Sequence, residues 1–395
     1  MKEKSYDKIR VVQATPYYPP HVGGIENLVR DLSHYLRERG HDVVVVTSDI
    51  PKGASKVDEI RTYRFKAIDI PYMPYVFNLK KKINRIDGDI FHSHSPSPFF
   101  SKAIDKRPHV ITYHSDLEVP PSVGRLRIPR PLRRSAEYLY EKMYARPILD
   151  SCDAIIATSK SYADSSPILC DYRYEVIPNA INIKKFDAVL SENLRSSLRD
   201  SQLPPPERKP RVLFVGRLFQ GKGIEYLIRT VPRVIKEVPQ ARYTIVGDGE
   251  ERDRLERLTK KLNVHEYVKF TGFIRFEELV KMYAESSVLV LPSITRLENF
   301  GIVLLEAMAC RTPVIASKIP GVMDLVTNEN GLLVEPKSVE GLAEAIISII
   351  HDENKVIKMG EKGRRLVEEE YNWDVVGAKI IDLYRKLIIQ KNEKA

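Results

Sequence analysis

The chain has 395 residues, a formal net charge of +10 and an apolar share of 43%, close to the average for soluble globular proteins. This length exceeds one ordinary domain and predicts two. No run of about 18 apolar residues occurs, so no membrane-spanning helix is predicted. Three scattered cysteines exclude a disulfide framework or a zinc ribbon; they are Cys152, Cys170 and Cys310.

The first half alternates short apolar runs with helical spacing. Residues 9–14 form an apolar run, and the valines at 43–46 predict a strand buried on both faces, as parallel sheets require. The helix between them is predicted from one apolar face, made of Ile25, Leu28, Val29, Leu32 and Leu36. Further strands are predicted at 89–94, 109–114, 153–158 and 174–178.

Composition shifts at residues 187–210, where prolines with flanking charges predict an exposed linker. A second series of strands and helices follows. Its predicted strands lie at 211–215, 242–246, 268–271, 288–291, 313–317 and 331–334, and its helices at 223–237, 251–262, 276–284 and from Phe300. Two alternating blocks predict an α/β fold with two parallel sheets, whose ligands bind beyond the carboxyl ends of the strands.

The segment ENFGIVLLE, residues 298–306, directly follows a predicted strand. A helix opening at Phe300 offers free N–H groups and the positive end of its dipole to a diphosphate. Gly301 allows a ligand to approach the backbone closely. Both features indicate an anion site.

Glu306 shares a helix face with Ile302 and Val303, behind this anion site, where its carboxylate could accept both hydroxyls of a ribose. The alternative is an amphipathic helix flanked by two glutamates by chance. That alternative is weaker because the helix continues into an apolar run, and a buried carboxylate needs a partner.

The segment GRLFQGKG, residues 216–223, follows the first strand of the second half. Arg217 and Lys222 flank a glycine-bearing turn that leads into a helix. Two fixed cations suit a diphosphate leaving group, because its negative charge grows as the glycosidic bond breaks. The alternative is a pair of solvated surface cations.

With these segments the chain resembles glycosyltransferase family 4, whose mark is two glutamates in the pattern Glu-x7-Glu, here Glu298 and Glu306. The resemblance runs from about Ile9 to Ile389. It implies the GT-B fold, with two Rossmann-like domains whose parallel sheets face across a cleft. The predicted domains are 1–186, completed by a C-terminal helix at about 374–395, and 211–373, with 187–210 as the linker.

The resemblance implies roles for individual residues. Glu306 would bind ribose, Glu298 the hydroxyls of the donor sugar, and Arg217 with Lys222 the pyrophosphate. The implied catalytic residues are His114, Glu298, Arg217 and Lys222. The implied substrate-binding residues are Gly23, Gly24, Asp116, Arg217, Lys222, Gly272, Phe273, Glu298, Asn299, Phe300, Gly301, Ile302 and Glu306. Neither a metal nor a cofactor is expected.

Two motifs of the first half are less specific. Gly23 and Gly24 open a helix but lack a G-x-G-x-x-G fingerprint; in similar enzymes such a pair lets the backbone approach donor phosphates and acceptor. His114 and Asp116 end the strand of TYHSD. A lone strand-end histidine is more often structural, but the resemblance places His114 by the donor sugar, where its side chain or main chain helps stabilise the transition state.

His92 and His94 share one strand face, which raises the question of a metal site. Packing is the favoured interpretation, because no third ligand stands nearby with suitable spacing. The chain departs from the family pattern at Ala180, where glycine is usual, and at Asp324, where glutamate is common.

Basic residues are dense in two runs of the first half. They could form a surface for anionic lipid or a lipid-phosphate acceptor, at about 1 kcal/mol for each cation near a charged membrane, or a solvated face. The runs comprise Arg125, Arg127, Arg130, Arg133 and Arg134, and Lys80, Lys81, Lys82 and Arg85.

The predicted function is transfer of a hexose, with retention, from a UDP-, GDP- or ADP-sugar to a hydroxyl of a glycan or lipid-linked acceptor. No carboxylate is an obvious nucleophile, so a same-face substitution is preferred. A sugar-nucleotide epimerase, a sugar phosphorylase and a non-catalytic sugar-nucleotide sensor stay open. A nucleic-acid-binding protein is disfavoured because no helix-turn-helix, KH or RNP pattern is present.

The N-terminal segment lacks the apolar region and cleavage site of a signal peptide. We therefore expect a cytoplasmic protein. Peripheral contact with the inner face of an anionic membrane stays open. The sequence does not identify the nucleotide base, the donor sugar or the acceptor, and it is compatible with a monomer or a homodimer.

Overall fold

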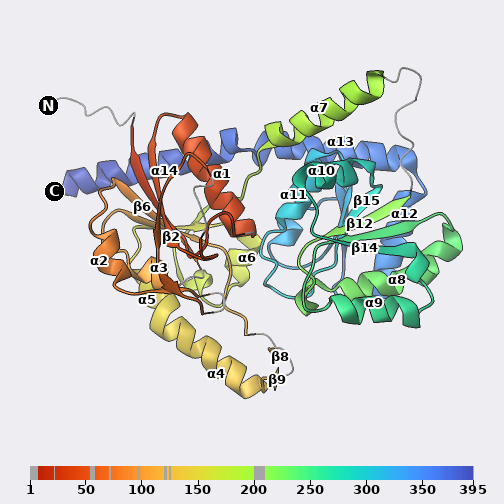
Figure 1. Cartoon of the computed structure of the whole chain (residues 1–395), viewed down its shortest axis with the longest axis horizontal. Coiled ribbons are helices and arrows are strands. Elements are labelled where there is room, and N and C mark those ends of the chain that lie inside the picture. The colour runs from red at the N-terminus through yellow and green to blue at the C-terminus, as the bar shows by residue number, and fades with distance from the viewer. Residues whose placement is uncertain are drawn as a thin grey trace. The chain divides into compact units, whose positions relative to one another are not determined.

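The computed structural model describes residues 8–21, 23–53, 58–70, 73–95, 98–119, 122–123, 126–199 and 210–394. The chain divides into two compact units. Unit 1 comprises residues 1–180 and 373–395, and unit 2 comprises residues 181–372. Each unit contains one large parallel sheet covered by helices (Figure 1), which confirms the predicted α/β class.

The sheet of unit 1 has the order β11-β10-β7-β6-β1-β2-β3, with all neighbours parallel. The order reverses between β1 and β6, which makes the ends of these two strands the switch point of the sheet. The bounds are β1 Arg10–Ala14, β2 Asp42–Ser48, β3 Arg61–Phe65, β6 Ile90–Ser95, β7 His109–Tyr113, β10 Ala154–Ala157 and β11 Glu175–Val176. Two short antiparallel pairs accompany it, β4 Ala67–Ile68 with β5 Tyr75–Val76, and β8 Ser122–Val123 with β9 Leu126–Arg127.

The helices of unit 1 include one from the far end of the sequence. Helix α14 packs its apolar side against the sheet core and against α1, where Trp373 stacks on Tyr35 at 6.2 Å between ring centroids. The helices are α1 Gly24–Glu38, α2 Leu79–Ile83, α3 Pro98–Lys102, α4 Arg130–Tyr140, α5 Arg146–Asp150, α6 Lys160–Ser165 and α14 Trp373–Lys394, with a π-helical turn at Glu141–Ala145 and a 3-10 turn at Leu169–Asp171.

The sheet of unit 2 has the order β14-β13-β12-β15-β16-β17, again parallel, and reverses between β12 and β15. Its strands are β12 Arg211–Val215, β13 Arg242–Val246, β14 Val268–Gly272, β15 Val288–Leu291, β16 Val314–Ser317 and β17 Gly331–Val334. Its helices are α7 Ile183–Arg199, α8 Ile224–Glu237, α9 Arg252–Lys261, α10 Phe276–Glu285, α11 Ile302–Ala309, α12 Val339–Ile350 and α13 Glu353–Glu370, with 3-10 turns at Gln220–Lys222, His265–Tyr267 and Val322–Asp324.

The linker segment and the start of α11 differ from the sequence-based expectations. The segment predicted as a linker holds helix α7 as far as Arg199, and Asp187 on this helix accepts two hydrogen bonds from the buried Arg364, at 2.8 and 3.0 Å. Residues 200–209, including Pro204, Pro205 and Pro206, lie outside the described residues. Helix α11 begins at Ile302 rather than at Phe300, because its N-cap, Gly301, has a left-handed backbone (φ 80°) outside the helix.

Candidate functional site

The loops that follow β12 and β15 meet at the switch point of unit 2. Ile294 N–H donates to the Gly221 carbonyl at 2.8 Å, which ties one loop to the other. Gly223 has φ 64°, and a Cβ atom there would lie 2.0 Å from the Pro292 carbonyl oxygen. Only glycine therefore allows this approach, which brings two loops distant in sequence into one site.

An ion pair between Lys222 and Glu298 joins the two loops. The side chains are only 17% and 11% exposed, so water screens the pair less than it screens a surface pair. Ser293 Oγ also donates to Glu298 Oε2, at 3.1 Å. Lys222 contacts the same oxygen, and within the described part of the chain Oε1 accepts no hydrogen bond, so it is available to a ligand hydroxyl.

Arg217 lies on the same loop but its side chain turns elsewhere. The guanidinium is 3.3 Å from Glu250 and the side chain is 53% exposed. Lys222 Nζ, in contrast, would lie 3.7 Å from a Cβ atom at Gly216. The structure thus gathers Lys222 and Glu298 against the end of β12, with the Arg217 side chain paired to Glu250 beside them.

The N-terminus of α11 follows four residues after Glu298. Gly301 is its N-cap and no side chain caps the helix, so its first N–H groups are available to an anion. Phe300 is buried and anchors the turn in the core. Asn299 Nδ2 is buried without a hydrogen-bond partner among the described residues, and a Cβ atom at Gly321 would lie 1.9 Å from the Asn299 carbonyl oxygen.

Glu306 is half-buried on α11, and Ile302 at the start of that helix is also half-buried. The Tyr283 hydroxyl donates to Glu306 Oε2 at 2.7 Å. Burial, and then the Glu306 carboxylate, raises the pKa of Tyr283 well above its ordinary value, so this hydroxyl stays protonated and donates. Tyr283 therefore orients the carboxylate.

Gly272 and Phe273 lie at the end of β14, farther along the same edge of the sheet. Gly272 has φ 70° and its carbonyl accepts from Gly247 N–H at 2.9 Å, which joins the ends of β13 and β14. The Phe273 side chain is exposed. Within the described part of the chain, neither residue contacts Lys222 or Glu298, so their substrate-binding role stays a prediction.

In unit 1, Gly23 and Gly24 precede and open α1. A Cβ atom at Gly23 would lie 2.1 Å from Glu26 Oε2. The carboxylate of Glu26 therefore folds back over the turn, where its Oε1 is 2.9 Å from His21 Nδ1. Gly24 has open space around its Cβ position. We predicted that the backbone of this turn approaches phosphates. The Glu26 carboxylate lies over the turn instead.

Asp116 is buried and accepts three hydrogen bonds from hydroxyl groups of its own unit. Tyr113 and Ser166 donate to Oδ1 at 2.9 and 2.7 Å, and Tyr162 donates to Oδ2 at 3.0 Å. These bonds satisfy a buried carboxylate and hold the segment after β7 in place. Its substrate-binding role stays a prediction.

The histidines of β6 make hydrogen bonds to side chains. His92 contacts Tyr384 at 2.6 Å and Thr112 at 2.7 Å, while His94 contacts Gln13 and His114. Within the described ranges, no group of three or more His, Cys, Asp or Glu residues could hold a metal ion.

Both departures from the family pattern fit their places in the structure. Ala180 is buried, and it is not among the described residues with positive φ, so alanine fits its backbone. Asp324 is exposed in a 3-10 turn. Ser293, Tyr283 and Gln13 were missed at the sequence level; Ser293 and Gln13 stand at predicted strand ends, whereas nothing in the sequence marks Tyr283.

Two family models match the chain. The model described as Glycosyl transferases group 1 matches residues 197–366. The model described as Glycosyltransferase Family 4 matches residues 22–185.

Individual proteins are similar along the whole chain or along half of it. An uncharacterised glycosyltransferase of Methanocaldococcus jannaschii is 31% identical over 95% of this chain and 98% of its own length. A GDP-mannose-dependent monoacylated alpha-(1-6)-phosphatidylinositol monomannoside mannosyltransferase of Corynebacterium glutamicum is 33% identical over 53% of this chain and 55% of its own. Among solved structures, sucrose-phosphate synthase of Thermosynechococcus elongatus has a TM-score of 0.75 at 26% identity, over 97% of this chain and all of the other.

Proposed function

This chain belongs to glycosyltransferase family 4 and has its GT-B fold, and we propose that it moves a hexose from a nucleotide diphosphate sugar to an acceptor hydroxyl with retention of configuration. The observation that carries the proposal is the Lys222–Glu298 pair at the switch point of unit 2. It sets an ammonium group for phosphate and a carboxylate for sugar hydroxyls side by side, four residues before an uncapped helix N-terminus.

In the proposed reaction the bond from the anomeric carbon to the diphosphate breaks, and a bond to the acceptor oxygen forms on the same face of the sugar. The acceptor proton passes to the leaving diphosphate. Lys222 and the N-terminus of α11 stabilise the growing negative charge, Arg217 joins them once it leaves Glu250, and His114 contacts the donor sugar. These cations replace a metal in the proposal, so transfer should proceed at the same rate in the presence of a chelator.

Ligand-detected NMR tests the donor site by measuring the binding of UDP-, GDP- and ADP-sugars. We expect one nucleotide class to bind, and Glu306→Gln to weaken it about tenfold or more, because a charge-assisted hydrogen bond contributes roughly 1.5–3 kcal/mol. The amide keeps the size of the side chain and can still accept from Tyr283. Glu285→Gln, on the exposed Glu285 paired with Arg211, is the matched control. Equal binding by both variants would remove Glu306 from the ribose site.

Turnover distinguishes transfer from the other activities of this fold. With the nucleotide class identified, products are analysed with and without an acceptor. A new glycoside that retains the anomeric configuration of the donor supports the proposal. An epimerised nucleotide sugar would identify an epimerase, and a sugar phosphate formed with inorganic phosphate would identify a phosphorylase; either product would contradict the proposal.

We further propose a lipid-linked acceptor at an anionic membrane surface. One relative acts on a phosphatidylinositol mannoside by its name, and α4 of this chain has the features of an interfacial helix. It has no buried residue. Leu132, Ala136 and Leu139 recur at four and three residues and so share one face, and Met143 follows with the same spacing; all four are exposed.

Cations accompany this apolar face. Arg130, Arg134 and Lys142 are exposed along α4 and the turn after it, as expected for a helix that lies on anionic lipid. Arg125 lies outside the described residues, and nothing is described of the Arg127 side chain. Among the described residues, no helix combines the length and apolar character needed to cross a bilayer.

Sedimentation with vesicles tests the membrane surface. We expect binding to vesicles rich in phosphatidylserine, weaker binding to phosphatidylcholine alone, and a loss in high salt. Leu139→Asp should reduce binding about tenfold or more, because burying one leucine contributes roughly 1.5–3 kcal/mol. Ile357→Asp, at an exposed apolar residue of α13, is the matched control. A Leu139→Asp variant that binds like the control would contradict the membrane proposal but not the proposed donor site.

A further inference from the structure

A row of polar side chains crosses the switch point of unit 1. Gln13 lies on β1, His94 on β6 and His114 directly after β7. His94 Nε2 is 2.9 Å from Gln13 Oε1, and His94 Nδ1 is 3.2 Å from His114 Nε2. All three side chains are buried. The row therefore connects the middle of the sheet to the residue that we place by the donor sugar.

The direction of the hydrogen bonds in this row follows from Gln13. An amide oxygen only accepts, so His94 Nε2 carries a hydrogen. Burial, with the neighbouring His92 and His114, holds the pKa of His94 well below its ordinary value, so the ring is neutral and its Nδ1 has a lone pair. His114 must then donate through Nε2–H.

The His114 ring is also neutral. Burial lowers the pKa of His114 to about 4, so near neutral pH it carries one hydrogen, which the contact to His94 places on Nε2. Nδ1 therefore keeps the lone pair. Among the described residues, His94 is the one hydrogen-bond partner of the His114 side chain, which leaves Nδ1 to a ligand.

Tyr384 supports the orientation of the Gln13 amide. Burial raises the pKa of Tyr384, and the nearby Gln13 side chain opposes that rise. A donor lowers the pKa of a phenol, so the amide nitrogen faces Tyr384 and the oxygen faces His94. Gln13 Nε2 makes no hydrogen bond to any described residue.

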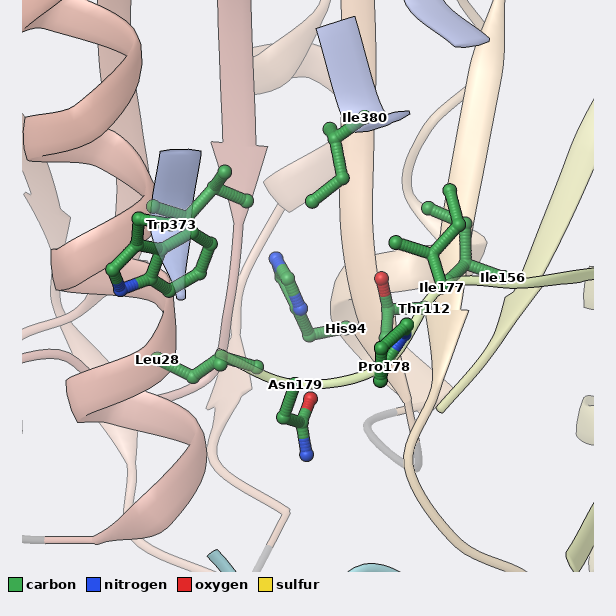
Figure 2. Close-up of a pocket in the computed structure, with 10 residues that line it drawn as sticks. Leu28, His94, Thr112, Ile156, Ile177, Pro178, Asn179, Trp373 and Ile380 are labelled. Carbon is green, nitrogen blue, oxygen red and sulfur yellow. The ribbon is translucent and has the colours of Figure 1, made fainter. Parts of the chain in front are cut away.

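A small cavity beside His94 keeps the row in an apolar setting. Figure 2 shows His94 between Trp373 on one side and Thr112 on the other. The cavity offers about 20 Å³ to the centre of a water molecule, enough for about one water. Most of its lining is apolar, including Leu28, Ile177, Trp373 and Ile380.

We propose that Gln13 and His94 are positioning residues that hold His114 as the neutral Nε2–H tautomer, so that His114 Nδ1 accepts a hydrogen bond from a substrate hydroxyl. His114 then orients a hydroxyl and is not a general acid. The identity of that hydroxyl, on the donor sugar, rests on the proposed function. The tautomer itself does not.

The tautomer is measured directly by ¹⁵N NMR of the full chain with labelled histidine rings, with the His114 signals assigned from a His114→Asn variant. We expect a protonated Nε2 and an unprotonated Nδ1 at pH 7. In Gln13→Met, which keeps the length of the side chain but removes the amide, we expect a mixture of the two tautomers. A wild-type ring protonated at Nδ1, or at both nitrogens, would overturn the proposal, whether or not transferase activity has been found.

Kinetics give the second readout. Gln13→Met should lower kcat about tenfold while KM for the donor changes less than threefold, since the substrate still binds but the acceptor atom is wrongly protonated in part of the molecules. Ser93→Ala is the matched control: Ser93 is the next residue on β6 and contacts another buried histidine, His109, at 2.8 Å. It should change neither the His114 tautomer nor kcat. Equal effects of the two variants would reduce the role of Gln13 to packing.

Discussion

The seven-stranded sheet of unit 1 and the six-stranded sheet of unit 2 reverse their strand order in the same way, but they carry different groups at their switch points. In unit 2, Lys222 and Glu298 form an ion pair that stays partly exposed to solvent. Among the described residues, Oε1 of Glu298 accepts no hydrogen bond. In unit 1, Gln13, His94 and His114 are buried, and both histidines are neutral. A charged pair can bind a charged ligand, whereas a neutral row can only orient one. In the proposal, unit 2 binds the diphosphate and unit 1 orients a hydroxyl.

The largest expected effect is on the charged side of this comparison. Lys222→Ala should lower kcat about 100- to 1,000-fold, because one preorganised group that stabilises a developing anion contributes roughly 2.7–4 kcal/mol. Initial rates at saturating donor measure it. Lys236→Ala, at a lysine in the last turn of α8, serves as the control. A Lys222→Ala enzyme within threefold of wild type would break the assignment of the diphosphate to this loop.

The backbone of the two glycine turns gives an intermediate effect. Gly223→Ala forces a Cβ atom to 2.0 Å from the Pro292 carbonyl at φ 64°, and should lower the free energy of unfolding by about 1–3 kcal/mol. Gly24→Ala meets open space and should cost far less. Thermal unfolding followed by circular dichroism compares the two. A larger loss for Gly24→Ala would contradict the geometry of both turns.

The last effect concerns pH and the neutral side of the comparison, and its size is stated for each histidine and each pH unit. Burial lowers the pKa of His109 and of His114 to about 4, whereas unfolded histidine titrates near 6.5. Above that value both states are neutral and the full stability is present. As the pH falls towards 4, the unfolded chain binds protons that the folded unit does not, so stability falls by about 1.4 kcal/mol per pH unit for each such histidine.

The single tryptophan of the chain makes this measurement specific. Trp373 lies in the core of unit 1, so its fluorescence reports urea unfolding of that unit. We expect the midpoint to decrease between pH 6.5 and pH 5, and the slope to become smaller in His109→Gln. A midpoint that is constant over this range would show that the buried histidines are not neutral as described.

Most of the fold was predictable because its strands are short apolar runs and its helices have a regular apolar period. Several elements were not predicted, and three of them illustrate the physical reasons. Strand β3 is half-exposed and lacks an apolar run, α4 buries none of its residues, and α7 is rich in charged and polar residues. The helix start at α11 was placed early because a left-handed Gly301 cannot be read from composition.

The sequence by itself determined the two-sheet α/β architecture, the family, and the residue types that meet phosphate, ribose and sugar in the proposal. Only the tertiary structure decided which partner each of them has. Lys222 and Glu298 stand 76 positions apart, and Gln13 and His94 stand 81 apart, yet each pair is in contact. Contacts over such separations depend on the order of strands in a sheet, which local sequence patterns do not encode.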